Sequence, residues 1–134
     1  KEILYRFRSD FRQTQQEDVN PVFTRQLIAK YSSLIEKVFI RNELLDYIAG
    51  LVHRTRTHPD LYLGASPRAS LAILRLSKAV AALAGRDFVT PDDIQQVAFP
   101  VLNHRIILTP EREMEGFGAK DVIAEILRGI EVPR

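Results

Sequence analysis

Residues 66–85 read SPRASLAILRLSKAVAALAG and contain both a helix start and a helix end. A serine followed by a proline is a typical helix start, because the hydroxyl can cap the first turn and a proline at the first helical position needs no N–H donor. Gly85 supplies the residue type that adopts the left-handed conformation at many helix ends. Apolar residues lie nearly all round the helix between these two signals, so we expect residues 66–84 to form the central and most buried helix.

Two amphipathic helices are predicted N-terminal to this stretch. The first follows Pro21, and the second begins with Asn42 as its cap and ends at His58-Pro59, because a residue before proline avoids helical geometry. A short helical segment within residues 1–9 and a polar loop over residues 12–20 precede them. The apolar residues of the two helices recur at three- and four-residue spacing: Leu27, Ile28, Tyr31, Leu34 and Ile35, then Leu44, Leu45, Ile48, Leu51 and Val52.

Two more helices are predicted on the C-terminal side. Thr90-Pro91 repeats the hydroxyl–proline start, and Asp92 and Asp93 occupy the first turn, where the helix dipole favours acids. Adjacent helical residues point about 100° apart, so capping explains both carboxylates better than paired acid–base chemistry does. We expect this short helix to end at Pro100 and residues 111–118 to form a polar loop. The apolar stripe of the last helix is Val122, Ile123, Ile126, Leu127 and Ile130.

Length and composition fit one small helical domain. The chain has 134 residues, of which 46% are hydrophobic and 27% charged, enough apolar material for one core. Residues 38–40 and 88–89 are β-branched or aromatic and could pair as a minimal two-strand contact. We therefore predict an all-α fold, a small helical bundle of about four main helices with no more than that strand contact added.

Charge and cysteine content exclude several classes of function. The 19 basic and 17 acidic residues leave a net charge of +2, too small for a global attraction to nucleic acid or anionic membrane. The absence of cysteine excludes disulfides, thiolate nucleophiles and thiol redox chemistry. No apolar run approaches the roughly 20 residues that span a bilayer, and the N-terminus has no signal-peptide core. We expect a soluble, cytoplasmic protein with no membrane span and no specific nucleic-acid partner.

Motifs for a self-contained active site are missing. No glycine opens the pattern Gly-x4-Gly-Lys-Ser/Thr that cradles phosphates. The three histidines, His53, His58 and His104, lack the His-Glu-x-x-His spacing of a zinc protease, and no serine occupies a Gly-x-Ser-x-Gly elbow. We therefore predict no metal site and no catalysis by these residues alone.

The placement of positive charge is the informative feature. Between residues 47 and 86 the only acid is Asp60, against the basic residues Arg54, Arg56, Arg68, Arg75, Lys78 and Arg86. Arg68 and Arg75 are seven residues apart, so they fall within roughly 20° of each other on one helix face and can share an anion. Arg54 and Arg56 end a predicted helix, where the dipole favours cations in any protein.

Arg68 is a cation at a position where the helix dipole favours an anion. It follows the Ser66-Pro67 start directly, so its cation lies in the first turn, where the positive end of the helix dipole disfavours it by a few tenths to about 1 kcal/mol. Such conflicts are expected at functional sites, and a phosphate at this helix end would satisfy the free N–H groups as well as the guanidinium. The alternative is an arginine whose head lies in water or on Asp60. The residues alone leave these two readings open.

Three ordered blocks carry a family resemblance: residues 55–69 (TRTHPDLYLGASPRA), 85–93 (GRDFVTPDD) and 101–105 (VLNHR). Together they closely resemble the C-terminal lid domain of MoxR-type AAA+ ATPases. The resemblance implies that residues 1–20 are the end of the segment that joins the family's nucleotide-binding core to the lid, and that residues 21–134 are the lid.

The resemblance also implies a function. Gly-Ala-Ser-Pro-Arg, ending at Arg68, is similar to the family's sensor 2 motif, in which the arginine reaches the nucleotide's γ-phosphate with the Ser66-Pro67 turn beside it. The Walker A and B motifs, sensor 1 and the arginine finger belong to the core, so we expect this chain alone to be non-catalytic and to hold no nucleotide tightly. In the full protein the family implies ATP and Mg, a ring, usually hexameric, and chaperone-like remodelling or maturation of other proteins. The implied partners are the core domain, neighbouring subunits and proteins with von Willebrand factor A domains.

Two alternatives remain at this point. The first is the lid of a magnesium-chelatase ATPase subunit, which has a related architecture and a similar sensor 2. The second is a small helical module that binds nucleic acid or an acidic protein through the basic residues between Arg54 and Arg86, without any ATPase.

Overall fold

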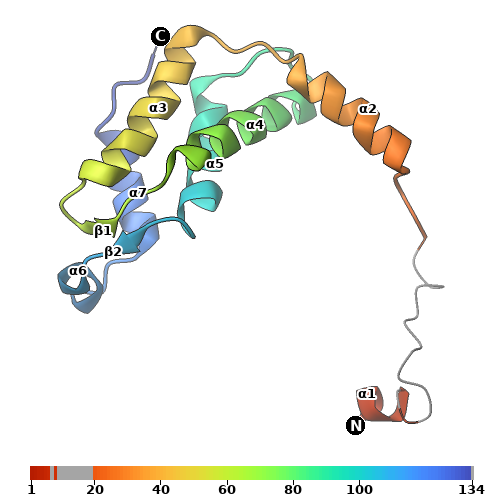
Figure 1. The fold of residues 1–134 in the computed structure, drawn as a ribbon, viewed down its shortest axis with the longest axis horizontal. Coiled ribbons are helices and arrows are strands. Elements are labelled where there is room, and N and C mark those ends of the chain that lie inside the picture. The colour runs from red at the N-terminus through yellow and green to blue at the C-terminus, as the bar shows by residue number, and fades with distance from the viewer. Residues whose placement is uncertain (7, 9–19, 134) are drawn as a thin grey trace. The chain divides into compact units, whose positions relative to one another are not determined.

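A computed structural model describes residues 1–6, 8 and 20–133 of the chain (Figure 1). The predicted loop over residues 12–20 falls outside the described residues except for Asn20. Residues Lys1–Tyr31 and Ser32–Arg134 form two compact units. The elements are α1 (Glu2–Arg6), α2 (Arg25–Glu36), α3 (Asn42–Thr57), β1 (Leu61–Leu63), α4 (Pro67–Leu83), α5 (Pro91–Leu102), β2 (Ile107–Leu108), α6 (Pro110–Met114) and α7 (Ala119–Arg128).

Four helices form the bundle. α3 packs against α4 and α7, and α5 packs against the same two helices, so the four close on one another around a single core (Figure 1). The largest fully buried apolar side chains come from all four: Leu44, Leu51, Ile73, Ile94, Leu102, Val122 and Ile123. The predicted all-α bundle is confirmed. Among the described residues, no helix is long and apolar enough to cross a membrane.

The prediction that α4 is the most buried helix is wrong. Its buried residues form one stripe at four-residue spacing, Ala69, Ile73, Ser77 and Ala81, whereas α5 buries Asp93, Ile94, Val97, Ala98, Val101 and Leu102. The surplus apolar residues of α4 face outward instead, with Leu71 55% and Leu83 88% exposed. α4 is therefore a helix with one packed face and one open face.

Helix boundaries differ from the sequence prediction in three places. Asn42 is the first residue of α3 rather than its cap. α5 continues through Pro100 to Leu102, because a proline in the last turn removes only one backbone hydrogen bond and the buried Val101 and Leu102 hold that turn. The predicted loop over residues 111–118 contains a short helix, α6, which begins with a further hydroxyl–proline pair at its N-terminus.

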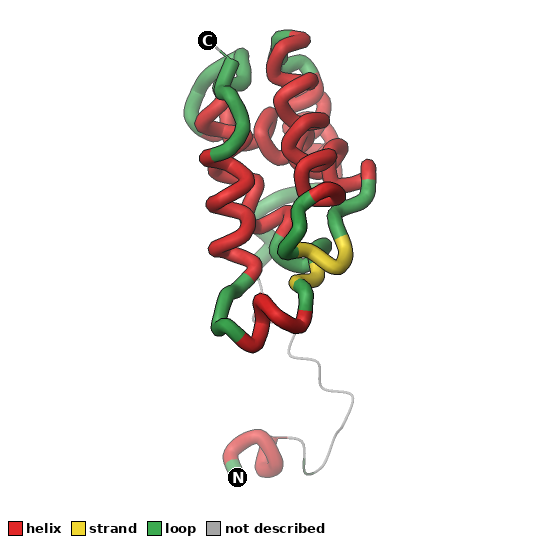
Figure 2. The backbone as a smooth tube through the Cα atoms, turned by 90° about the vertical axis from the view of Figure 1, so that its left-hand side faces the viewer, coloured by secondary structure: helices red, strands yellow, loops and turns green. Residues whose placement is uncertain are grey.

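Two small strand contacts complete the fold. The predicted contact between residues 38–40 and 88–89 is confirmed as a single parallel bridge between Phe39 and Phe88. The antiparallel pairing of β1 with β2 was not predicted, because runs of two or three residues are too short for an alternating pattern. Both strands and α6 lie at the end of the bundle where α3 stops (Figures 1 and 2).

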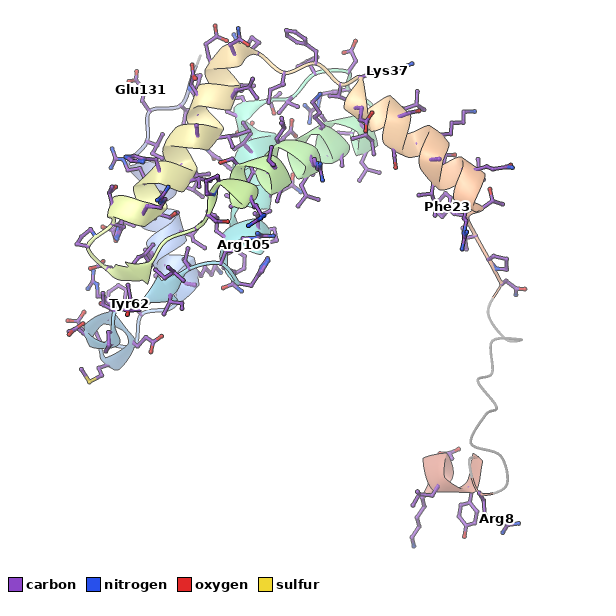
Figure 3. All side chains as sticks on the ribbon, viewed as in Figure 1. Arg8, Phe23, Lys37, Tyr62, Arg105 and Glu131 are labelled. Atoms are coloured by element: carbon purple, nitrogen blue, oxygen red, sulfur yellow. The ribbon has the colours of Figure 1, made fainter. Side chains whose placement is uncertain are left out.

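α2 has the predicted amphipathic pattern but no buried residue. Its apolar side chains, including Ile28, Tyr31 and Leu34, are about half exposed. Phe23 and Lys37, labelled in Figure 3, flank its two ends in sequence. Periodicity predicted this helix correctly, but no described residue buries its apolar face.

Candidate functional site

The candidate site is the start of α4. Pro67 is the first helical residue, and Ser66 precedes it in an extended conformation with φ −77° and ψ 163°. The Ser66 hydroxyl makes no capping hydrogen bond, although the sequence predicts one. Arg68 is exposed, and no hydrogen bond or ion pair joins it to any described residue. The Ala69 N–H donates to the Ser66 carbonyl at 2.8 Å, so what the first turn leaves open is the Ser66 hydroxyl and the Arg68 guanidinium.

Gly64 fixes the loop that leads into this turn. A Cβ at Gly64 would lie 2.6 Å from the Arg56 Cα and would also collide with the Thr55 carbonyl oxygen. The loop thus passes directly against the backbone of the last turn of α3. Only glycine allows this approach, which is the physical reason for the first residue of the motif.

Thr55 holds the same loop by hydrogen bonds. The Ala65 N–H donates to Thr55 Oγ1 at 2.9 Å, and this hydroxyl donates to the Val52 carbonyl at 2.7 Å. Thr55 and Ala65 are both fully buried. Thr55 was missed as a site residue, although its position four residues after Leu51 on the buried stripe of α3 would have indicated a buried hydroxyl in need of partners.

Asp60 does not pair with Arg68, so that form of the alternative reading is wrong. Its Oδ2 accepts from Arg112 Nη2 at 2.8 Å, and Arg112 Nη1 also donates to Glu115 at 2.8 Å. The Arg112 guanidinium lies 4.2 Å from the centre of the Phe117 ring. Its hydrogen bond lowers the pKa of the Asp60 carboxyl below the usual range. Arg112, for which no sequence pattern predicted a role, thus joins α6 to the turn before β1.

The other basic residues of the region divide into paired and unpaired groups. Arg86 donates to both carboxylate oxygens of Asp93, at 2.8 and 2.6 Å, and the Lys78 ammonium donates to the Glu36 carbonyl at 2.9 Å. Arg75 is exposed and, like Arg68, has no hydrogen bond or ion pair with a described residue. The structure thus leaves the two arginines predicted to share a face without a partner.

Asp93 has a structural role. It is 3% exposed and accepts hydrogen bonds from the Thr90 backbone N–H at 2.8 Å and the Thr90 hydroxyl at 3.0 Å. The Arg86 hydrogen bond, followed by those from Thr90, lowers the pKa of the Asp93 carboxyl. Asp92 is exposed. The capping interpretation of Asp93 is therefore confirmed.

One group of side chains has the composition of a metal site. His58, Asp60 and Glu125 each offer a ligand atom within 4.8 Å of the others. Two of these residues have protein partners already, since His58 Nδ1 accepts the Asp60 N–H at 3.3 Å and the Asp60 carboxylate pairs with Arg112. His58 Nε2 lies 4.0 Å from Glu125 Oε1. These contacts link the turn after α3 to α7.

Comparison with known proteins now adds to this geometry. The family described as "AAA lid domain" matches residues 53–126. "Uncharacterized protein YeaC" of Bacillus subtilis is 37% identical over 87% of this chain, and "Chaperone MoxR1" of Mycobacterium tuberculosis is 29% identical over 100% of it. This chain spans 37% of the length of each relative.

A solved structure agrees. The crystal structure of a "putative ATPase" from Cytophaga hutchinsonii superposes with a TM-score of 0.81 at 34% identity, covering 99% of this chain and 42% of that chain. A "Magnesium-chelatase subunit ChlI homolog" of Methanocaldococcus jannaschii is 32% identical over a smaller share, 64% of this chain. These similarities, together with the helical bundle, define the lid domain of an AAA+ ATPase. This chain belongs to the AAA lid domain family, as the lid domain of a MoxR-family AAA+ ATPase.

Proposed function

We propose that this chain senses nucleotide for a MoxR-like ATPase, with Arg68 contacting the γ-phosphate of ATP bound to the core domain. One observation carries the proposal: Arg68 stands exposed and unpaired in an open first turn of α4. A phosphate there would meet a guanidinium and the positive end of the helix dipole together. Ser66 and Pro67 shape the turn beside it, and Ser66 has a hydroxyl free to bond a phosphate oxygen.

Gly64 and Thr55 support this assignment as positioning residues. They fix the loop before Ser66 against α3, so the arginine is presented from a rigid base rather than a mobile loop. Precise placement matters, because a charge-assisted contact contributes to catalysis only when its donor already points at the developing charge.

The remaining parts of the proposal concern the full-length protein. Residues 1–20 would end the segment from the core, and residues 21–134 would form the lid. The core would supply the ATP and Mg site, and neighbouring subunits would complete a ring, usually hexameric. Chaperone-like remodelling of other proteins, with a von Willebrand factor A-domain partner, is the corresponding cellular role. The name "Chaperone MoxR1" of one relative supports this role.

The experiment is an ATPase assay on the full-length protein that contains this chain. Arg68→Ala should lower turnover about tenfold or more, the loss of one charge-assisted contact to phosphate. Arg128→Ala, which removes an equal charge from the exposed end of α7, is the matched control and should leave turnover unchanged. Normal turnover of Arg68→Ala would refute the proposal.

A magnesium-chelatase subunit is the second candidate, supported by the similarity over 64% of this chain. Both candidates assign the same role to Arg68, so they differ only in the partner of the ring. Co-purification of the full-length protein with its native partner separates them: chelatase subunits in one case, a von Willebrand factor A-domain protein in the other.

A further inference from the structure

The open face of α4 carries two unpaired arginines. The buried stripe of this helix is Ala69, Ile73, Ser77 and Ala81. At 100° per residue, Arg68 and Arg75 lie about 160° to 180° from the middle of that stripe, directly opposite the core. Both are exposed, and their Cα atoms are about 10 Å apart along the helix axis, two turns of helix.

Nothing in the described part of the chain neutralises this face. Arg86 and Arg112 pair with carboxylates, and Lys78 donates to a backbone carbonyl, whereas Arg68 and Arg75 bond to no described residue. α4 itself, Pro67–Leu83, contains no acid at all. Two cations on one face without a counter-charge repel each other, so an anion that meets both is stabilised by both.

We propose that Arg75 is a second phosphate-contacting residue, which together with Arg68 binds a linear polyphosphate along the open face of α4. This inference rests on the proposed function, because it extends the nucleotide contact from the γ-phosphate at Arg68 to the linked phosphates. A single phosphate group fits one guanidinium. Two long, flexible side chains two turns apart suit a chain of linked phosphates better, because each guanidinium can take a different group.

The separation of the two arginines gives a test with a defined probe. Inorganic triphosphate and orthophosphate are titrated into this chain, and binding is followed by NMR at the arginine side-chain Nε–H groups. Triphosphate should shift the signals of both Arg68 and Arg75, whereas orthophosphate should shift that of Arg68 more than that of Arg75. No core domain is needed, so the readout is independent of ATPase activity.

Three variants separate the contributions. Arg75→Ala should weaken triphosphate binding about fivefold, the upper range for one exposed charge pair, and leave orthophosphate binding nearly unchanged. Arg68→Ala should weaken the binding of both anions. The matched control, Arg128→Ala, removes the same charge from the exposed end of α7 and should change each affinity less than twofold.

The outcomes distinguish this inference from the proposed function. If Arg68→Ala weakens binding while Arg75→Ala behaves as Arg128→Ala does, Arg75 has no phosphate role but the γ-phosphate assignment of Arg68 stands. If neither variant differs from the control, both assignments fail at this surface. If the unmodified chain gives no saturable shift with triphosphate, the two-arginine site is refuted. The inference is supported only if both variants are weakened for triphosphate and only Arg68→Ala for orthophosphate.

Discussion

The N-terminal ends of α4 and α5 share a sequence pattern but differ in their contacts. Each has a hydroxyl residue in the capping position and a proline at the first helical position, Ser66-Pro67 in one and Thr90-Pro91 in the other. At α5 the next residues are acids, and Asp93 takes hydrogen bonds from Thr90 and a two-pronged bond from Arg86. At α4 the next residue is Arg68, and the Ser66 hydroxyl caps nothing.

This difference separates a structural helix start from a functional one. The start of α5 is closed, since the Asp93 carboxylate there is bound by both Arg86 and Thr90. At the start of α4, Gly64 and Thr55 fix the preceding loop against α3, but the Ser66 hydroxyl makes no capping bond. A helix end that is fixed in place but has unpaired polar groups is suited to bind a ligand. The conformational entropy of ordering those groups has already been lost during folding, so binding does not have to supply it.

The largest effect on stability is expected at Gly64, which fixes the loop before α4. Gly64→Ala would place a Cβ against the backbone of Thr55 and Arg56, which cannot move aside as a side chain could. We expect a loss of about 3 kcal/mol in the free energy of unfolding, measured by urea denaturation.

Gly50→Ala is the matched control for this change. Gly50 lies inside α3, and a Cβ there meets nothing within 4 Å. Alanine should therefore raise stability by about 0.5 to 1 kcal/mol through helix propensity. Equal effects of the two substitutions would show that the loop is not anchored at Gly64.

The second prediction concerns the charge of Asp93 at the start of α5. Asp93→Asn keeps the side-chain shape but removes the charge that Arg86 and Thr90 bind, so we expect a loss of about 2 kcal/mol in unfolding free energy. Asp92→Asn, one residue away and exposed, should change stability by less than about 0.5 kcal/mol. A large effect of Asp92→Asn would contradict the assignment of the cap to Asp93.

The pH dependence of stability tests whether the charge of Asp93 stabilises the start of α5. Arg86 and Thr90 lower the pKa of Asp93 in the folded state, so the stability that this carboxylate contributes is present above its unfolded pKa of about 4 and is lost as pH falls through the folded value. The difference between the unmodified chain and Asp93→Asn should therefore be full at pH 7 and shrink below about pH 4. A constant difference down to pH 2 would mean that the charge of Asp93 is not what stabilises the start of α5.

Much of this contrast could be predicted from sequence, because local patterns determine helix starts. Thr90-Pro91 and Ser66-Pro67 marked both helices, and the cation in the first turn marked Arg68. Thr109-Pro110 is the same signal at α6, but the residues after it are polar and too few for periodicity to indicate a helix.

The supports of the site could not be predicted in this way, because they act between segments distant in sequence. Thr55 bonds Ala65 ten residues later, and Asp60 pairs with Arg112 across β1 and β2. The closeness of Gly64 to α3 depends on how the loop returns, which composition does not encode. The exposed face of α4 was also unforeseen, because an apolar helix that has only one packed side looks the same in sequence as one buried all round.

The smallest effect on stability is expected at Arg68 itself. Because its cation lies in the first turn of α4, Arg68→Ala should leave the unfolding free energy of the chain unchanged or raise it by a few tenths of a kcal/mol. Arg128→Ala gives the opposite sign, since Arg128 lies in the last turn of α7, where the dipole favours a cation, so its loss should lower stability by a few tenths. Denaturation curves of both variants at low ionic strength, where the dipole effect is least screened, measure this difference. If Arg68→Ala instead lowers stability by more than about 1 kcal/mol, the arginine holds the fold together, and the open start of α4 is then as structural as the closed start of α5.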